Sequence, residues 1–286
     1  MSVGPATVAT PRPTRLTAVR QVVSDYVSLT KPKVQSLLLL TTVTTMYVAG
    51  EPSIGLVLVT VVGGYLAAGG AGAVNHYYDR DIDARMARTA DRPVPSGRVA
   101  PAAALWFGIA LAALSFSGFL GYVLVYTVWL KRRTAQNIVI GGAAGAVPPL
   151  VAWAAVDGAL SGTAIYLFAI VFFWTPPHFW ALSLLMKDEY AKVGVPMLPV
   201  VRGEDETRKQ ILLYTFLLYA VTQLPFCAGG FGGIYLAASL LLGAAFIGGS
   251  VLLYRRADRR SALRLYLFSL LYLALLFGAM VADVHL

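Results

Sequence analysis

The sequence is poor in charged residues and almost without cysteine. Only 13% of its 286 residues are charged, whereas 58% are apolar, and a soluble domain carries about 25% charged residues. This shortage excludes an ordinary soluble enzyme. The single cysteine, Cys227, lies in an apolar stretch, so a disulfide framework is excluded as well. Residues 1–30 contain no long apolar run, and we therefore expect no cleavable signal peptide.

Apolar stretches account for most of the chain, and about 20 such residues cross a bilayer as a helix. We predict an all-α, polytopic membrane helical bundle, formed by residues 31–286 as one domain. Residues 1–30 are predicted to be a cytoplasmic tail that includes an interfacial amphipathic helix, Arg15–Leu29. Spans are predicted near residues 34–50, 54–75, 137–156, 161–185, 210–228, 232–254 and 262–282.

The net charge of +9 comes from basic residues that lie between the apolar stretches. All 23 Lys and Arg residues fall in five clusters, at 12–33, 80–98, 131–133, 187–209 and 255–264. Cytoplasmic loops collect Lys and Arg, so we predict that all five clusters and the N-terminus are cytoplasmic and that nucleic acid is not a partner.

Residues 101–130 are too many for one comfortable span and short of the roughly 40 that two spans need. If this stretch crossed once, the later basic clusters would face the opposite side of the membrane. A shallow hairpin keeps all five clusters on one side. We therefore predict about nine membrane helices, of which the third and fourth are shortened, with the C-terminus outside.

Asn75, Asp79 and Asp83 stand four residues apart at the end of an apolar stretch. On a helix they share one face, and the sequence places no cation there to neutralise the carboxylates. Mg²⁺ uses one or two protein carboxylates together with substrate phosphates. The spacing therefore predicts a metal site at the membrane surface, open to a diphosphate. Asp188 follows another apolar stretch and is a further candidate ligand, or else part of an ordinary charged helix end.

Arginines follow the carboxylates in the same loop, and a guanidinium binds phosphate oxygens in bidentate fashion. A loop that contacts lipid headgroups is the alternative. These arginines are Arg85, Arg88, Arg92 and Arg98.

His178 lies deep in a predicted span, after Pro176 and Pro177, which are expected to kink the helix. Ionisable residues at that depth usually mark a site. If the helix is regular beyond the kink, His178 and Glu189 share a face and one cavity could join them. A histidine that is hydrogen-bonded between helices is the alternative.

These residues resemble the UbiA-type intramembrane prenyltransferases, whose first acidic motif has the form NxxxDxxxD. Within that superfamily the resemblance is closest to the protohaem IX farnesyltransferases, and it covers nearly all of residues 26–283. The segments WTPPHFWAL (174–182) and GVPMLPVV (194–201) point to this haem branch. The other matching segments are LTKPK (29–33), the loop 75–98, VYTVWLKRR (125–133) and NIVIGGAAGAVPP (137–149). The chain departs from the family in its shortened third and fourth spans and in its second acidic motif, reduced to Asp188 and Glu189.

The resemblance implies Mg²⁺-dependent transfer of a farnesyl group from farnesyl diphosphate to a vinyl group of haem B, giving haem O and pyrophosphate. Haem B would be a substrate rather than a cofactor. Other implied partners are the lipid bilayer of a prokaryotic plasma membrane and haem A synthase or oxidase assembly proteins. The implied site residues are Asn75, Asp79 and Asp83 for catalysis, the same three with Asp188 for the metal, Lys31, Arg98, Lys131 and Arg132 for the diphosphate, and His178 and Trp180 for the acceptor.

Two other functions stay open at this point. A UbiA-type enzyme with a quinone-precursor or other aromatic acceptor would use the same acidic motif. A membrane transporter would also place polar residues at span ends, but it needs a polar pathway to the other side of the membrane. The sequence has almost no such residues there, which disfavours transport.

Overall fold

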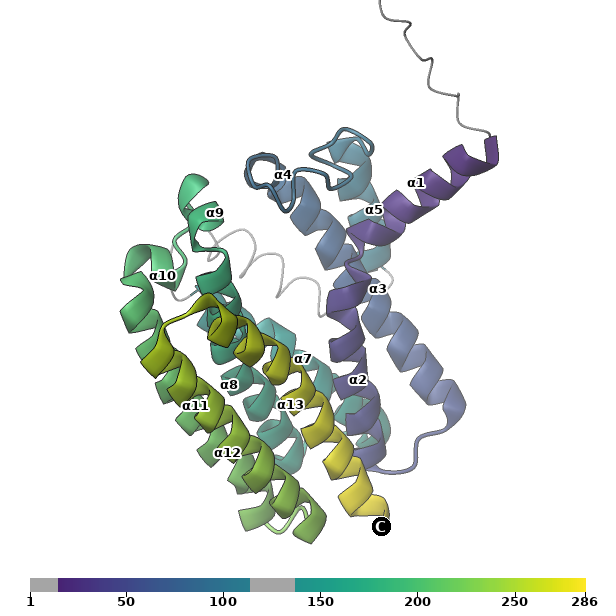
Figure 1. The fold of residues 1–286 in the computed structure, drawn as a ribbon. Helices are drawn as coiled ribbons and strands as arrows, with labels where there is room; N and C mark the ends of the chain where they lie inside the picture. Colours follow the sequence, from purple (N-terminus) through teal and green to yellow (C-terminus); the bar gives the residue numbers. More distant parts are fainter. Residues whose placement is uncertain (1–14, 114–136) are drawn as a thin grey trace, which may run out of the picture.

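The computed structural model describes residues 15–113 and 137–286, and every regular element in these ranges is a helix. The all-α prediction is therefore confirmed (Figure 1). The helices are α1 (Arg15–Leu29), α2 (Pro32–Ala49), α3 (Ile54–Tyr78), α4 (Arg80–Asp83), α5 (Pro101–Ala113), α7 (Asn137–Asp157), α8 (Gly162–Leu185), α9 (Lys187–Lys192), α10 (Leu198–Val201), α11 (Gly203–Cys227), α12 (Gly233–Arg256) and α13 (Arg259–His285).

The predicted spans coincide with α2, α3, α7, α8, α11, α12 and α13. Among the described residues, five of these helices, α3, α8, α11, α12 and α13, are long and apolar enough to cross a membrane. The hairpin expected within 101–130 lies largely outside the described residues, so the count of nine spans stays a prediction. Pro176 and Pro177 lie inside α8, which continues to Leu185, so the proline pair does not end the helix.

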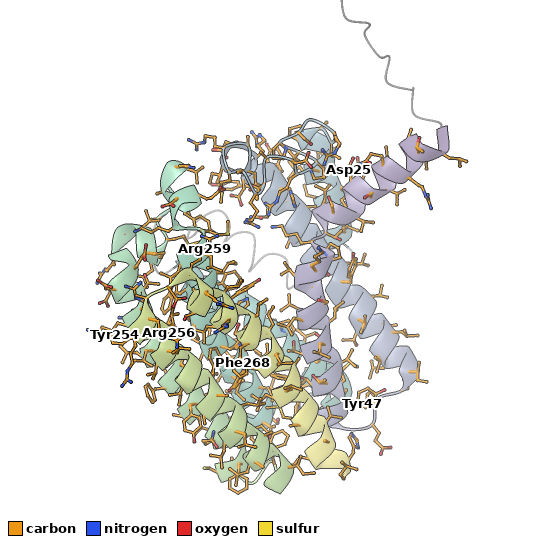
Figure 2. The ribbon with its side chains drawn as sticks, in the orientation of Figure 1. Asp25, Tyr47, Tyr254, Arg256, Arg259 and Phe268 are labelled. Carbon is orange, nitrogen blue, oxygen red and sulfur yellow. The ribbon has the colours of Figure 1, made fainter. Side chains whose placement is uncertain are left out.

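One end of the molecule gathers the described polar loops, with α1, α4, α9 and α10 (Figure 1). Figure 2 shows Asp25 and Arg259 toward this end and Tyr47 toward the other. At the opposite end of the molecule, the last turns of α2 and α13 lie side by side. The carbonyl oxygen of Tyr47 is 3.1 Å from His285 Nε2. A Cβ on Gly50 would lie 3.3 Å from Val156, so α7 also runs toward that end. α7 therefore starts from the polar end, as the hairpin prediction requires.

We expect cysteines placed at Arg85, Lys192 and Arg259 to react with a membrane-impermeant maleimide from the same side of the membrane. The three positions lie in different basic clusters at the polar end of the molecule, and such clusters stay on the cytoplasmic side. Labelling in inverted against right-side-out vesicles measures this. Opposite labelling of any two positions would contradict the predicted topology.

Close backbone contact fixes α3 against its neighbours near the acidic motif. A Cβ on Gly72 would lie 3.0 Å from the carbonyl oxygen of Leu29, at the corner between α1 and α2. A Cβ on Gly108 of α5 would lie 2.8 Å from the Gly70 carbonyl oxygen. Small residues let membrane helices approach this closely. The end of α3 is therefore held between the α1–α2 corner and α5.

Candidate active site

The acidic motif is buried at the polar end of α3. Asn75, Asp79 and Asp83 are only 3%, 2% and 4% exposed. Asn75 lies in the last turn of α3, Asp79 caps that helix, and Asp83 ends α4. The amide of Asp79 bonds to the carbonyl of Asn75 at 2.9 Å and that of Asp83 to the carbonyl of Asp79 at 2.8 Å. Helical spacing therefore continues across the junction and keeps the three side chains on one side.

Polar contacts tie the motif together. Asn75 Nδ2 donates to Asp79 Oδ2 at 2.7 Å, and Lys31 Nζ donates to Asn75 Oδ1. Lys31 has a left-handed backbone, with φ 55° and ψ 55°. A non-glycine residue in this region costs on the order of 1 kcal/mol. Lys31 thus has an uncommon backbone conformation, and its ammonium group contacts the acidic motif through Asn75.

Arg92 forms an ion pair with Asp83, at 2.7 Å between Nη1 and Oδ2. The sequence-based expectation that no protein cation neutralises these carboxylates is therefore wrong for Asp83. The loop folds back over the site, and the Thr89 hydroxyl donates to the Asp83 carbonyl at 2.9 Å. Nothing in the local spacing predicts this fold-back, because it depends on the path of the whole loop.

The donor set at this site fits Mg²⁺ in chemistry. Asp79 and Asp83 offer hard carboxylate oxygens in a buried place, and Mg²⁺ needs only one or two of these when substrate phosphates supply the rest. Among the described residues, no group of three or more His, Cys, Asp or Glu side chains is placed to hold a metal ion. A site with two carboxylates would therefore depend on the substrate for further ligands.

Asp188 is not brought together with Asp79 and Asp83. α8 ends at Leu185, the backbone turns at Met186, and Asp188 is exposed on the separate short helix α9. The break also removes the regular helix on which a shared face of His178 and Glu189 depended. The metal role of Asp188 stays a prediction that this arrangement does not support.

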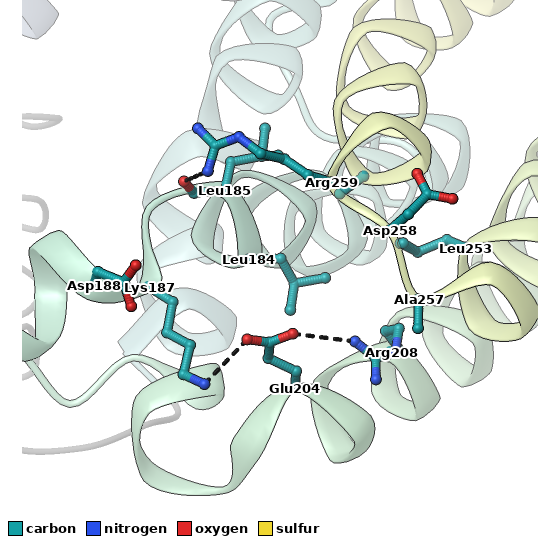
Figure 3. A pocket seen from close by; sticks show the side chains of 11 residues that line it. Leu184, Leu185, Lys187, Asp188, Glu204, Arg208, Leu253, Ala257, Asp258 and Arg259 are labelled. Carbon is teal, nitrogen blue, oxygen red and sulfur yellow. Dashed lines mark hydrogen bonds and ion pairs between the residues drawn. The ribbon is translucent and has the colours of Figure 1, made fainter.

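Asp188 instead lines a charged cavity of about 210 Å³ between the polar ends of α8, α11, α12 and α13 (Figure 3). Glu204 accepts hydrogen bonds from Lys187 at 3.0 Å and from Arg208 at 3.3 Å. Arg259 donates to the carbonyl of Leu185 at 2.8 Å. Glu204 thus pairs with Lys187 and Arg208, and no residue of the acidic motif lines this cavity.

The predicted diphosphate-binding residues divide into three groups. Lys31 contacts the acidic motif, and Lys131 and Arg132 lie outside the described residues. Arg98 is held by two carboxylates, with its Nε 3.1 Å from Asp25 Oδ1 and its Nη1 3.0 Å from Asp91 Oδ1. The hydrogen bonds that Arg98 donates to Asp25 and then to Asp91 raise the pKa of its guanidinium above the ordinary value. Arg98 is thus engaged within the protein.

The predicted acceptor residues His178 and Trp180 are buried, at 6% and 2% exposure. The imidazole of His178 stacks between Trp174 and Tyr266, with ring centroids 4.3 Å and 4.8 Å away. Its Nδ1 lies 2.6 Å from Ser269 Oγ on α13. His178 therefore joins α8 to α13, which agrees with the alternative of a histidine hydrogen-bonded between helices.

The bond to Ser269 assigns the tautomer of His178. Ser269 Oγ donates its one hydrogen to the carbonyl of Tyr266 at 2.6 Å, so it accepts from His178. Nδ1 therefore carries the hydrogen, and Nε2 of the neutral imidazole keeps its lone pair. This nitrogen suits a metal ion or a hydrogen-bond donor, and it does not suit a carboxylate.

The fold and the site define a polytopic helical membrane protein with two buried carboxylates at the polar end of its apolar helices. The family model for the UbiA prenyltransferase family matches residues 38–276. The chain belongs to the UbiA prenyltransferase family, and it is an integral membrane protein.

Curated relatives agree with the haem-branch resemblance. A protein named protoheme IX farnesyltransferase from Chloroflexus aurantiacus is 54% identical over 284 residues, which cover 93% of this chain and 48% of that protein. One of the same name from Symbiobacterium thermophilum is 53% identical over 283 residues, covering 92% of this chain and 95% of that protein. The chain thus spans about half the length of the first relative and nearly all of the second.

Solved structures share the fold at low sequence identity. A structure of digeranylgeranylglyceryl phosphate synthase has a TM-score of 0.74 at 17% identity and covers 92% of this chain and 98% of that one. A UbiA homologue from Archaeoglobus fulgidus bound to DMAPP and Mg²⁺ has a TM-score of 0.64 at 18% identity, covering 90% of this chain and 99% of that one. These likenesses confirm the UbiA-like helical fold.

Proposed function

We propose that this protein transfers a farnesyl group from farnesyl diphosphate to a vinyl group of haem B, with addition of water, to give haem O and pyrophosphate. The observation that carries the proposed reaction class is the pair of buried carboxylates, Asp79 and Asp83, at the polar end of apolar helices. The choice of acceptor rests on relatives named protoheme IX farnesyltransferase that are 54% and 53% identical.

In this mechanism Asp79 and Asp83 would hold Mg²⁺, as the relative bound to DMAPP and Mg²⁺ suggests. The metal would neutralise the diphosphate and stabilise the departing pyrophosphate. Lys31, beside Asn75, would bind a diphosphate oxygen, and Arg92 would hold Asp83 in place. Apolar helices around the prenyl chain would keep water from the allylic cation. Lys131 and Arg132 are further candidates for the phosphate charge.

On the acceptor side we propose His178, with Trp180 in the wall behind it. Ser269 fixes the ring and leaves Nε2 as the free lone pair, which makes iron ligation the better-supported of its possible roles. We further propose a prokaryotic plasma membrane location, a cytoplasmic N-terminus and an outer C-terminus. Haem A synthase or oxidase assembly proteins would be partners that receive or direct the product.

Lys31→Met is expected to raise the KM for farnesyl diphosphate by about 10- to 100-fold, since a hydrogen bond from a charged group contributes about 1.5–3 kcal/mol. The KM for haem B should stay near that of the unaltered protein. Lys33→Met is the matched control, because Lys33 is an exposed lysine two residues away. Equal KM values in both variants would remove Lys31 from the site.

The test of the function is direct product analysis. Protein in lipid nanodiscs is incubated with farnesyl diphosphate, Mg²⁺ and haem B, and the porphyrins are separated and identified by mass. We expect a product with the mass of haem O that is lost on adding EDTA. Transfer to a hydroxybenzoate or quinone precursor with none to haem B would overturn the proposed acceptor and favour the alternative aromatic substrate.

A further inference from the structure

A buried carboxylate lies on α1, a helix whose other described residues are exposed except Tyr26 and Leu29. Asp25 is 5% exposed, whereas Val19, Val23 and Val27 of the same helix are 58%, 57% and 46% exposed. Arg98 Nε donates to Asp25 Oδ1 at 3.1 Å, and Gln21 donates to the same oxygen at 3.2 Å. The outward face of α1 is thus apolar, and its inward carboxylate binds a residue 73 positions later.

Arg98 extends this contact into the loop that covers the acidic motif. It donates to Asp91 twice, to the carboxylate at 3.0 Å and to the main-chain carbonyl at 2.7 Å. The next residue, Arg92, forms the 2.7 Å ion pair with Asp83. Polar contacts, together with the peptide link between Asp91 and Arg92, therefore connect Asp25 on α1 to Asp83.

The loop between these contacts is ordered by its own main chain and by a small apolar cluster. The amide of Val99 bonds to the carbonyl of Pro93 at 2.9 Å. Val94 and Val99 are 5% and 4% exposed and pack with Leu29 and Ala73. Val99, next to Arg98, thus belongs to a buried cluster that joins the loop to α1 and α3.

We propose that Asp25 and Arg98 are positioning residues, which hold the loop 84–99 against α1 and thereby keep Arg92 on Asp83. This inference rests on the proposed function for its effect on catalysis, but the contacts themselves do not. We call the contact between Asp25 and Arg98 the clamp. Arg98 then serves this contact and does not bind the diphosphate. The apolar outward face of α1 fits a lipid surface, so the clamp would connect the membrane-facing helix to the candidate metal site.

Hydrogen–deuterium exchange on the full chain in nanodiscs, without metal or substrate, tests the clamp independently of activity. In Asp25→Asn and in Arg98→Gln we expect exchange of the Gly97 and Val99 amides to rise by about tenfold, since a hydrogen bond between charged groups is strong and Asp25 is buried. The double variant should match the single ones, because both remove one interaction. Asp91→Asn is the control, since that carboxylate is 97% exposed and surface pairs contribute little.

Kinetics separate a clamp from a diphosphate ligand. With the clamp, Asp25→Asn and Arg98→Gln lower kcat by similar factors, raise the half-saturating Mg²⁺ concentration together, and are not additive. Asp25→Glu, which keeps the charge, should restore part of the loss.

Unchanged amide exchange in both single variants would overturn the proposal, as would a rise in KM for farnesyl diphosphate confined to Arg98→Gln. If no variant or wild-type protein forms haem O while the exchange result holds, the failure lies with the proposed function and not with the clamp.

Discussion

Asp79→Asn and Asp83→Asn are each expected to lower the rate of prenyl transfer by about a hundred- to a thousandfold, the scale seen when a preorganised electrostatic group is removed from an active site. Both carboxylates are almost completely buried, and the proposed metal has no other described cluster of acidic or histidine ligands to bind. Turnover with farnesyl diphosphate and haem B at saturating Mg²⁺ measures the effect.

Asp83→Asn is also expected to lower the stability of the protein. Asp83→Asn removes the negative partner of Arg92, whose side chain is 27% exposed, and losing one member of a partly buried pair is destabilising. Thermal unfolding should therefore show a loss of stability for Asp83→Asn. Asp81→Asn is the control, because Asp81 is exposed on the same short helix. Full activity in Asp79→Asn and Asp83→Asn would contradict the metal site.

His178→Ala is expected to abolish use of haem B while leaving the affinity for farnesyl diphosphate nearly unchanged. The ring lies on α8, whereas the acidic motif lies on α3 and α4, and Ser269 bonds to Nδ1 of the ring rather than to Nε2. Removing a ring that is packed between Trp174 and Tyr266 should also lower stability, by about 3 kcal/mol for a large buried side chain. Haem titration by the Soret band and a separate diphosphate titration measure the two affinities.

Ser269→Ala separates the two roles of His178. It keeps the imidazole and removes only its fixed orientation, and losing such a supporting contact costs about 10- to 100-fold in affinity at metal-binding histidines. We expect haem affinity to fall by less than in His178→Ala, with diphosphate affinity unchanged. Equal weakening of both substrates in both variants would make His178 purely a link between α8 and α13.

Some residues of the candidate site could be predicted from sequence patterns a few residues long, and others could not. The spacing of Asn75, Asp79 and Asp83 predicted a common face, and the helical hydrogen bonds across Asp79 keep that spacing. The role of Arg98 was harder to predict from the sequence, because an arginine beside carboxylates can bind either a phosphate or a carboxylate of the protein. Its partner Asp25 carries no sequence signal, since it is one acidic residue on an amphipathic helix.

Composition and periodicity by themselves determined that this is a helical membrane protein, where its long helices lie and where its acidic motif is. Those properties depend on the transfer of apolar residues from water and on hydrogen bonds within a few residues, both of which are local. Only the tertiary structure decided that Arg92 neutralises Asp83, that Ser269 sets the tautomer of His178, and that Asp188 lies apart from the motif. The Arg92 contact depends on how the loop folds back over nine residues, and the Ser269 contact on how segments 91 residues apart pack, so both are fixed by the path of the chain.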